Sequence, residues 1–496
     1  MTANDKNGQS RKSDHDEGET GDGPVCGSLC GNRGMITVRG YEGSRVGVLG
    51  LGRSGLAAAR SLASGGAIPV CWDDGEAARD AAAAEGFAVE DLTKDKAWVD
   101  TIMLVVSPGV PHLFPNAHPA IGAARKAGAL VDNDVSLFFR SLAMTDAEVK
   151  VICITGSNGK STTTALVDHI LASCGKPRQM GGNIGRGVLD LDPVADGEFV
   201  VLELSSYQLD LARALQPDIA VFLNLSPDHL DRHGGEGGYF AAKRRLFELG
   251  APDHSIIGVD DPFGQFLGTA TQDPAGESAL TKVATTQKVK GDDRSVFMNK
   301  NHLTEWKGKQ IAAFDMRQAP NLQGKHNHQN ACAAWAVARA VNLGPKLIQN
   351  ALISFPGLPH RMEIVGEANG VTYVNDSKAT NADAAEKALL TYQNIHWIAG
   401  GVAKAGGIEP LLPLMDRVAK TYLIGEATDE FAFQLGDNPF EVCGDLAAAI
   451  AKASANAGDG DVVLLSPACA SFDQFPSFEA RGDAFRDAAL KLIEAA

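Results

Sequence analysis

Apolar and polar positions alternate in blocks along the chain, and the blocks predict a repeated order of strand and helix. The first unit reads RVGVLG, LGRSGLAAARSLASGG and AIPVCWDD, over residues 45–50, 51–66 and 67–74. A short apolar run, a longer segment rich in Ala and Leu, and a second apolar run form a βαβ unit with two parallel strands. The pattern therefore predicts an α/β protein.

Pro and Gly divide the rest of the pattern into further blocks of the same kind. One block opens with the apolar run VICIT (151–155), and another opens at the Pro/Gly-rich stretch FPGLPHR (355–361). Each block alternates short apolar runs with helical patterns, which is typical of α/β layers with parallel or mixed sheets. We expect three α/β domains: a Rossmann-like domain over 41–145, a P-loop ATPase-like domain with a parallel sheet over 146–355, and a Rossmann-like domain over 356–496.

Residues 1–40 lack this pattern, because they are polar, rich in Gly and almost free of large apolar side chains. A segment of this composition cannot bury enough surface to offset the conformational entropy that ordering would cost. We predict a disordered tail over 1–40. Met35 is an alternative start of translation.

The totals fit a globular protein and argue against two classes of partner. The 496 residues are 44% hydrophobic and 21% charged, with a formal net charge of −16. A general binder of nucleic acid or of acidic membranes needs a basic face, so we expect neither partner. No apolar run reaches the length of a membrane span and no leader opens the chain, so we expect a cytoplasmic enzyme.

A glycine-rich turn after the apolar run 151–155 has the context of a phosphate loop. Its residues are Gly156, Ser157, Asn158, Gly159, Lys160, Ser161 and Thr162. The glycines let backbone N–H groups face phosphate oxygens, Lys160 neutralises charge, and Ser161 or Thr162 is a candidate ligand of Mg²⁺. The alternative is a structural turn with an exposed lysine.

A second glycine loop follows the strand at 45–49. Gly50, Gly52 and Gly55 have the spacing of a dinucleotide fingerprint, and Asp73 and Asp74 end the next strand. The loop is suited to NAD, and equally to another nucleotide diphosphate over a helix N-terminus. Close packing of helix on sheet is the third explanation.

Polar residues also follow two later strands. Glu203 ends the strand in VLELSSYQLD, where a carboxylate typically faces a phosphate loop and holds Mg²⁺; helix capping is the alternative. Asp228 and His229 follow another strand, at the kind of sheet edge where ligands gather. His229 is a candidate for contact with metal or substrate, or a residue that stabilises the turn.

Lys243, in AAKRRLF, has two interpretations. A basic helix face is the usual reading of such a run. A lysine amine that stays neutral can also add CO₂, and the resulting carbamate is an anionic oxygen ligand for Mg²⁺.

The chain from about Arg45 to its C-terminus resembles the Mur ligases of peptidoglycan synthesis. The motifs that carry the resemblance stand in the order TGSNGKSTTT, GGNIG, LELSSYQLD, NLSPDHLDRHG, AAKRRLF, GKHNHQNACAA, GLPHRMEIV, NDSKATN and SPACASFDQF. Their form is similar to that of the members that add D-glutamate. The resemblance implies ATP-dependent ligation of D-glutamate to UDP-N-acetylmuramoyl-L-alanine through an acyl phosphate, by a cytoplasmic enzyme that we expect to be a monomer.

The resemblance also implies a role for each matching residue. It assigns the first domain to the UDP substrate, the second to ATP with two Mg²⁺ ions, and the third to D-glutamate. The catalytic residues would be Lys160, His229, Lys243 and Lys378, with Lys243 carbamylated. The ligands of the metal ions would be Ser161, Glu203, His229 and Lys243. The ATP site would combine the phosphate loop with Asn327, Asn330, Arg361 and Asp376. The UDP substrate would contact Gly50, Gly52, Ser54, Gly55, Asp73, Asp74, Ser107 and Asn183. The D-glutamate site would contain Thr380, Lys404, Ser471 and Phe478.

One departure and three rival functions stand beside this assignment. Val402, in GGVAK, replaces an acidic residue that is common in the family before the matching lysine. A nicotinamide-dependent oxidoreductase would explain the first glycine loop but not the second. A P-loop ATPase without ligase chemistry would hydrolyse ATP without the other substrates, and a related amide ligase would prefer another amino acid.

Overall fold

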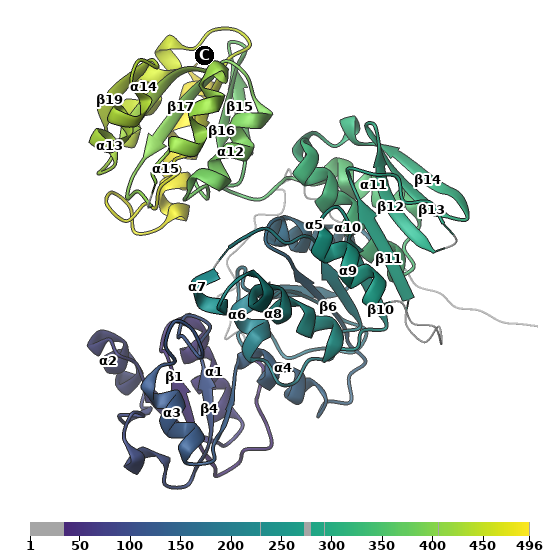
Figure 1. The fold of residues 1–496 in the computed structure, drawn as a ribbon, viewed down its shortest axis with the longest axis vertical. Coiled ribbons are helices and arrows are strands. Elements are labelled where there is room, and N and C mark those ends of the chain that lie inside the picture. Colours follow the sequence, from purple (N-terminus) through teal and green to yellow (C-terminus); the bar gives the residue numbers. More distant parts are fainter. Residues whose placement is uncertain (1–33, 229, 272–278, 292, 405, 496) are drawn as a thin grey trace, which may run out of the picture. The chain divides into compact units, whose positions relative to one another are not determined.

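The computed structural model describes residues 34–228, 230–271, 279–291, 293–404 and 406–495, which contain three β-sheets (Figure 1). The sheets follow one another along the sequence. Within those ranges, no helix is both long enough and apolar enough to cross a membrane. The predicted α/β class is confirmed.

The first sheet has five parallel strands in the order β3-β2-β1-β4-β5. The strands are β1 (Arg45–Leu49), β2 (Ile68–Trp72), β3 (Ala88–Val89), β4 (Thr101–Val106) and β5 (Leu130–Asp132). The helices of this part are α1 (Arg53–Ser64), α2 (Glu76–Ala84), η1 (Asp95–Trp98), α3 (Pro119–Lys126) and α4 (Asp134–Leu142). The chain order reverses between β1 and β4, so the loops that follow these two strands meet at one edge of the sheet.

The second sheet has nine strands in the order β14-β13-β12-β11-β10-β9-β6-β8-β7. The strands are β6 (Lys150–Thr155), β7 (Arg178–Gly182), β8 (Phe199–Glu203), β9 (Ile219–Phe222), β10 (His254–Gly258), β11 (Ala279–Ala284), β12 (Arg294–Asn299), β13 (His302–Lys307) and β14 (Lys309–Asp315). The helices are α5 (Lys160–Ser173), α6 (Ser206–Leu211), α7 (Leu230–His233), α8 (Glu236–Glu248), α9 (Pro262–Ala270), η2 (Met316–Gln318), η3 (Pro320–Leu322), α10 (Lys325–Ala340) and α11 (Pro345–Ser354).

The second sheet is not wholly parallel, which corrects the expectation of a parallel sheet. β13 pairs antiparallel with both β12 and β14. The other neighbouring strands, in the spatial order β12, β11, β10, β9, β6, β8 and β7, pair in parallel. Gly308 alone joins β13 to β14, with φ at 65°. So short a connection reverses the chain and forces a hairpin.

The third sheet has six strands in the order β15-β16-β20-β17-β18-β19, and β15 alone is antiparallel to its neighbour. The strands are β15 (Glu363–Ala368), β16 (Val371–Asn375), β17 (Ile395–Gly400), β18 (Val418–Ile424), β19 (Phe440–Gly444) and β20 (Val462–Leu465). The helices are α12 (Ala382–Thr391), η4 (Glu409–Arg417), α13 (Thr428–Leu435), α14 (Leu446–Asn456) and α15 (Phe478–Glu494).

The predicted tail ends earlier than residue 40. Ile36 and Val38 are buried within the hydrophobic core. Their backbone N–H groups donate to the carbonyl oxygens of Leu189 (3.2 Å) and Ser61 (3.0 Å). Met35–Ala496 accordingly forms one compact unit. The boundary at residue 40 was wrong because two alternating apolar side chains are enough to anchor an extended segment; residues 1–33 lie outside the described part of the chain.

Candidate active site

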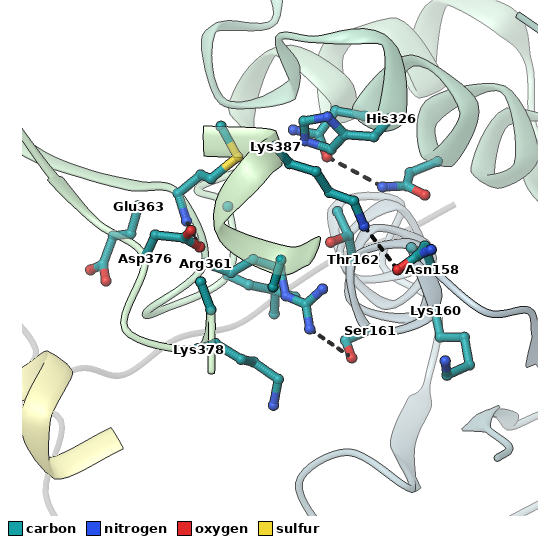
Figure 2. Close-up of a pocket in the computed structure, with 18 of the residues that line it drawn as sticks. Asn158, Lys160, Ser161, Thr162, His326, Arg361, Glu363, Asp376, Lys378 and Lys387 are labelled. Carbon is teal, nitrogen blue, oxygen red and sulfur yellow. Dashed lines mark hydrogen bonds between the residues drawn. The ribbon is translucent and has the colours of Figure 1, made fainter. Parts of the chain in front are cut away.

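A cavity of about 430 Å³ brings together two stretches of chain that are far apart in sequence. One stretch is the phosphate loop between β6 and α5. The other runs from Pro356 to Lys387 and includes the turn after β16 and the first half of α12. Figure 2 shows side chains of both stretches pointing into the same space.

The phosphate loop has the conformation that its glycines make possible. Gly156 has φ at 152° and Gly159 has φ at 84°, in the region that favours glycine. A Cβ atom on Gly159 would lie 2.2 Å from Oδ1 of Asn330, so a larger residue would collide there. The residues from Ser157 to Thr162 line the cavity, and Gly156 lies behind them.

Lys160 begins α5 and its side chain folds back over the loop. Its Nζ atom donates to the carbonyl oxygens of Gly156 (2.9 Å) and Ser157 (2.8 Å). Burial lowers the pKa of Lys160, and the positive charge of Arg361 adds to that effect. The lysine is therefore not the exposed side chain of an ordinary turn, and an anion in the cavity would stabilise its charge.

Glu203 lies at the end of β8, where Ile154 of β6 is its neighbour across the sheet. Its carboxylate is buried; Oε1 accepts a hydrogen bond of 2.9 Å from Nδ2 of Asn183, and Oε2 has no hydrogen-bond partner in the described part of the chain. Glu203, Asn183 and Ser161 all line the cavity. A buried carboxylate oxygen without a partner, in a cavity that a hydroxyl group also lines, fits a hard cation such as Mg²⁺.

The structure does not place the other two predicted metal ligands, His229 and Lys243, beside Glu203 and Ser161 among the described lining residues of the cavity. His229 lies outside the described residues, and Lys243 does not line the cavity. The residues that are described include no group of three or more His, Cys, Asp or Glu side chains arranged to hold a metal ion.

Lys243 is buried in α8, behind the phosphate loop. Its Nζ atom donates a hydrogen bond of 2.8 Å to the carbonyl oxygen of Gly156 and lies 4.5 Å from the ring centroid of Tyr239. Burial lowers the pKa of Lys243 well below its ordinary value, and Lys160 lowers it further. A surface role is therefore wrong for this lysine, and a neutral amine is the form that reacts with CO₂.

The segments that precede β15 and follow β16 contribute Arg361 and Asp376. Nη2 of Arg361 lies 3.4 Å from Oγ of Ser161, although the two residues are 200 positions apart (Figure 2). Asp376 follows β16; Oδ1 accepts from the N–H of Met362 (3.1 Å) and Oδ2 from Oγ of Ser466 (2.8 Å). Burial raises the pKa of Asp376 to about 7, even though these hydrogen bonds oppose the shift.

Of the residues predicted around D-glutamate, the structure brings two near the cavity. Thr380 lines it, and the ring of Phe478 has its centroid 4.2 Å from Nζ of Lys378, which also lines the cavity. Lys404 is exposed and Ser471 is buried, and neither lines the cavity. Burial lowers the pKa of Lys378.

Asn327 and Asn330, which were predicted to belong to the ATP site, lie at the start of α10. Nδ2 of Asn330 donates to Oδ1 of Asn327 (3.2 Å), and Oδ1 of Asn330 accepts from Oγ1 of Thr163 (3.2 Å). Both asparagines line the cavity. The Thr163 contact links the start of α10 to the first turn of α5.

The first glycine loop lies apart from this cavity, which includes only Asn183 of the predicted contacts for the UDP substrate. Asp73 supports the loop, because its carboxylate accepts from the N–H groups of Leu51 (2.7 Å) and Gly75 (2.8 Å). Oγ of Ser107 donates to the carbonyl oxygen of Gly50 (2.6 Å). Asp74 is exposed and contacts His118 instead, and Ser54 lies in the first turn of α1.

The cavity also contains residues to which the sequence motifs gave no role, among them His326 and Lys387. His326 lies at the start of α10, where burial and the charge of Lys387 lower its pKa to about 4. Lys387 lies on α12 and donates to Asn158 across the cavity (2.8 Å). A lysine on a helix gives no signal of its own, because most such residues face solvent.

Comparison with known proteins connects these features to one family. The model described as "Mur ligase middle domain" matches residues 154–338, and "Mur ligase, glutamate ligase domain" matches residues 360–469. A protein of Cereibacter sphaeroides named UDP-N-acetylmuramoylalanine–D-glutamate ligase is 56% identical over 92% of this chain and 100% of its own length. A protein of Ruegeria pomeroyi with the same name is 54% identical over 93% of this chain and 100% of its own length.

Solved structures share the fold at lower identity. The UDP-N-acetylmuramate–alanine ligase of Thermotoga maritima has a TM-score of 0.56 at 17% identity, covering 90% of this chain and 99% of its own. The UDP-N-acetylmuramoylalanyl-D-glutamyl-2,6-diaminopimelate–D-alanyl-D-alanyl ligase of Acinetobacter baumannii has a TM-score of 0.53 at 18% identity, covering 73% and 81%. With the family models and the near full-length relatives, the assignment is plain: the chain belongs to the Mur ligase family.

Proposed function

We propose that this chain ligates D-glutamate to UDP-N-acetylmuramoyl-L-alanine with ATP as the energy source, in the cytoplasmic synthesis of peptidoglycan precursors. The observation that carries the proposal is the cavity in which the phosphate loop faces Arg361, Asp376, Lys378 and Thr380. Relatives at 54–56% identity that are named for this reaction support the choice of D-glutamate. They favour a ligase over the oxidoreductase and the simple ATPase.

The chemistry begins with an unreactive carboxylate. An oxygen of the L-alanine carboxylate attacks the γ-phosphorus of ATP, and the bond from that phosphorus to the bridging oxygen of the β-phosphate breaks. The products of this step are ADP, which is the leaving group, and an acyl phosphate. Both partners are anions, so neutralising their charge is the main requirement. Lys160 and Lys378, which both line the cavity, are the cations assigned to this step.

Amide formation follows. The neutral amine of D-glutamate attacks the carbonyl carbon of the acyl phosphate, a tetrahedral intermediate forms, and phosphate leaves while the nitrogen loses a proton. His229 and a nearby carboxylate are the candidates to accept this proton. Thr380, Lys404, Ser471 and Phe478 are proposed to bind D-glutamate, and closure of the domains is expected to precede the chemistry.

Magnesium belongs to the same proposal. When bound, Mg²⁺ neutralises phosphate charge and orients the γ-phosphate. Ser161, Glu203, His229 and carbamylated Lys243 are proposed to hold two such ions. The buried, unpartnered Oε2 atom supports Glu203 as a ligand of these ions, and the lowered pKa supports Lys243 as a ligand after carbamylation.

The domain division and the partners are proposed in the same way. The Rossmann-like domain 41–145 would bind the UDP group over its glycine loop, with Asn183 contacting the substrate from the central domain. The domain 146–355 would bind ATP, and the Rossmann-like domain 356–496 would bind D-glutamate. The protein is proposed to act as a monomer, without nucleic acid or membrane. The topological switch point between β1 and β4 supports the first assignment.

An assay of phosphate release tests the function. The purified chain is given ATP, Mg²⁺ and UDP-N-acetylmuramoyl-L-alanine with D-glutamate, L-glutamate, L-alanine or diaminopimelate. We expect phosphate release with D-glutamate, and none when the UDP substrate is left out. The variant Lys160→Ala is the matched control and should be nearly inactive. Faster release with L-alanine or diaminopimelate would overturn the choice of amino acid but not the ligase chemistry.

A further inference from the structure

Lys387 is a cation in the cavity that neither the sequence motifs nor the proposed reaction uses. It lies on α12, the helix that follows the turn carrying Lys378 and Thr380. Its Nζ atom donates a hydrogen bond of 2.8 Å to Oδ1 of Asn158, in the phosphate loop (Figure 2). The contact joins residues 229 positions apart in the chain.

Asn158 is held in place by other residues, so Lys387 meets a fixed partner. The backbone N–H of Asn158 donates to Oδ1 of Asn224 (2.9 Å), and its Nδ2 atom donates to Oγ of Ser226 (3.1 Å). These contacts leave the side-chain oxygen of Asn158 for the lysine. The ammonium group is thereby directed to the outer rim of the phosphate loop.

The contact to Asn158 does not balance the charge of Lys387. The lysine is half-buried, its acceptor is a neutral amide, and none of the ion pairs formed within the described ranges includes it. Burial lowers the pKa of Lys387 and the charge of Arg361 lowers it further, and together they outweigh the opposing charges of Asp383, Asp376 and Glu386. A half-buried ammonium group next to other cations is costly unless an anion joins them.

Three carboxylates that line the cavity accept hydrogen bonds from residues other than Lys387. Glu203 accepts from Asn183, Glu363 from Arg486, and Asp376 from Ser466. The cations Lys160, Arg361, Lys378 and Lys387 all line the cavity. A ligand with several negative charges would stabilise all four, and a nucleoside triphosphate has that charge.

We propose that Lys387 is a phosphate-binding residue of this enzyme, whose ammonium group binds the triphosphate of ATP at the rim that Asn158 forms. The inference rests on the proposed function and adds to it a residue of α12. The phosphate is favoured over the carboxylates of D-glutamate because the side chain points at the phosphate loop.

Equilibrium binding of nucleotides to the full chain tests the inference. The ligands are ATP, ADP, AMP and adenosine, measured by titration calorimetry with Mg²⁺ and without the other substrates. Lys387→Gln removes the charge but keeps a donor for Asn158, and Lys387→Arg keeps the charge. Lys491→Gln, on the exposed face of α15, is the matched control. Thermal unfolding checks that each variant is folded.

We expect Lys387→Gln to raise the Kd for ATP about tenfold or more, as for a lost charge-assisted hydrogen bond. The Kd for ADP should rise less and that for adenosine should not change, while Lys387→Arg should retain most of the affinity. An unchanged Kd for ATP, or an equal loss for ATP and adenosine, would overturn the inference alone. Failure of the unaltered protein to bind ATP would instead overturn the proposed function, and the role of Lys387 with it.

Discussion

Nδ2 of Asn183 donates a hydrogen bond of 2.9 Å to Oε1 of the buried Glu203, while Oε2 of the same carboxylate has no hydrogen-bond partner among the residues that the structure describes. The asparagine holds the carboxylate in one orientation. The second oxygen is then left for a ligand that tolerates burial, and a cation is the ligand that a carboxylate favours. Asn183 thus has a role toward Glu203 in addition to its proposed contact with the substrate.

Glu203→Gln should slow phosphate release by a factor on the order of 100, because the amide offers a cation no negative charge. The free energy of unfolding should not fall, since the oxygen that is lost has no partner. Assays over a range of Mg²⁺ concentrations measure the effect. Glu198→Gln, just before the other end of β8, is the control and should keep its rate. A variant at position 203 with the normal rate and Mg²⁺ dependence would show that Glu203 has no role toward metal.

Lys243→Ala should be nearly inactive and partly rescued by acetate or another small carboxylate. The amine is buried with a lowered pKa, so the neutral form that adds CO₂ is favoured. In the variant, an acetate ion would occupy the vacated space and return an anionic oxygen. Arg244→Ala is the control, since Arg244 pairs with Glu248 on the same helix, and added acetate should not change its rate. Full activity of Lys243→Ala without additive would remove the carbamate from the mechanism.

Gly55→Ala and Gly52→Ala should separate packing from ligand binding in the first glycine loop. A Cβ atom on Gly55 would lie 1.8 Å from the carbonyl oxygen of Gly50, so this variant should lose about 1–3 kcal/mol of stability or more. Gly52 has φ at −67° and no atom within 4 Å of an added Cβ, so stability should change by less than about 0.5 kcal/mol.

The same pair tests the proposed UDP site. Because Gly52 borders open space at the N-terminus of α1, its variant should raise the KM for the UDP substrate more than the KM for ATP. Urea unfolding and steady-state kinetics measure the two effects. A stable Gly52→Ala protein with an unchanged KM for the UDP substrate would contradict a pyrophosphate over this loop.

Asp210 should make the protein less stable in acid. Oδ2 of Asp210 lies 3.1 Å from Nε2 of the buried His112 and 3.5 Å from Nδ1 of the buried His233. Burial alone would raise the pKa of Asp210, but the two imidazoles outweigh burial and hold that pKa below its ordinary value of 3.8. The unfolded chain therefore binds the proton first, so this stabilisation is present above about pH 4 and is lost as the pH falls further.

Asp210→Asn should lower the free energy of unfolding at pH 7 by about 1–3 kcal/mol, the range for a buried polar group that loses its partner. Its stability should also fall less steeply than that of the unaltered chain between about pH 5 and pH 3. Denaturant unfolding at a series of pH values gives both quantities. Asp218→Asn, which removes a half-exposed pair with Lys150, is the comparison. Parallel stability curves for Asp210→Asn and the unaltered chain would show that the two histidines do not affect this carboxylate.

Local pattern was sufficient for the α/β class and for the strands and helices that flank the two glycine loops. The helix at Glu236–Glu248 and that at Lys325–Ala340 follow from apolar spacing, and β6 with its glycine turn follows from one short motif. These features depend on residues that lie close together in the chain, so a short stretch of sequence is enough to predict them. The antiparallel pairing of β13 and the burial of Ile36 do not follow from local pattern, because each depends on a partner elsewhere in the chain.

The candidate site divides in the same way. Residue types and spacing were enough to single out Lys160 and Glu203, since the chemistry of phosphate and metal requires such side chains after strands and turns. For Lys243 the same pattern favoured a basic helix face, and only the resemblance of AAKRRLF to the Mur ligases implied a role at the metal. The tertiary structure alone decided that Arg361 meets Ser161 and that Lys387 meets Asn158, because these pairs are 200 and 229 residues apart. It also decided that the amine of Lys243 is buried, since that depends on the residues packed around α8. Spacing along a chain sets which side chains share an element; only the packing of elements sets which of them share a cavity.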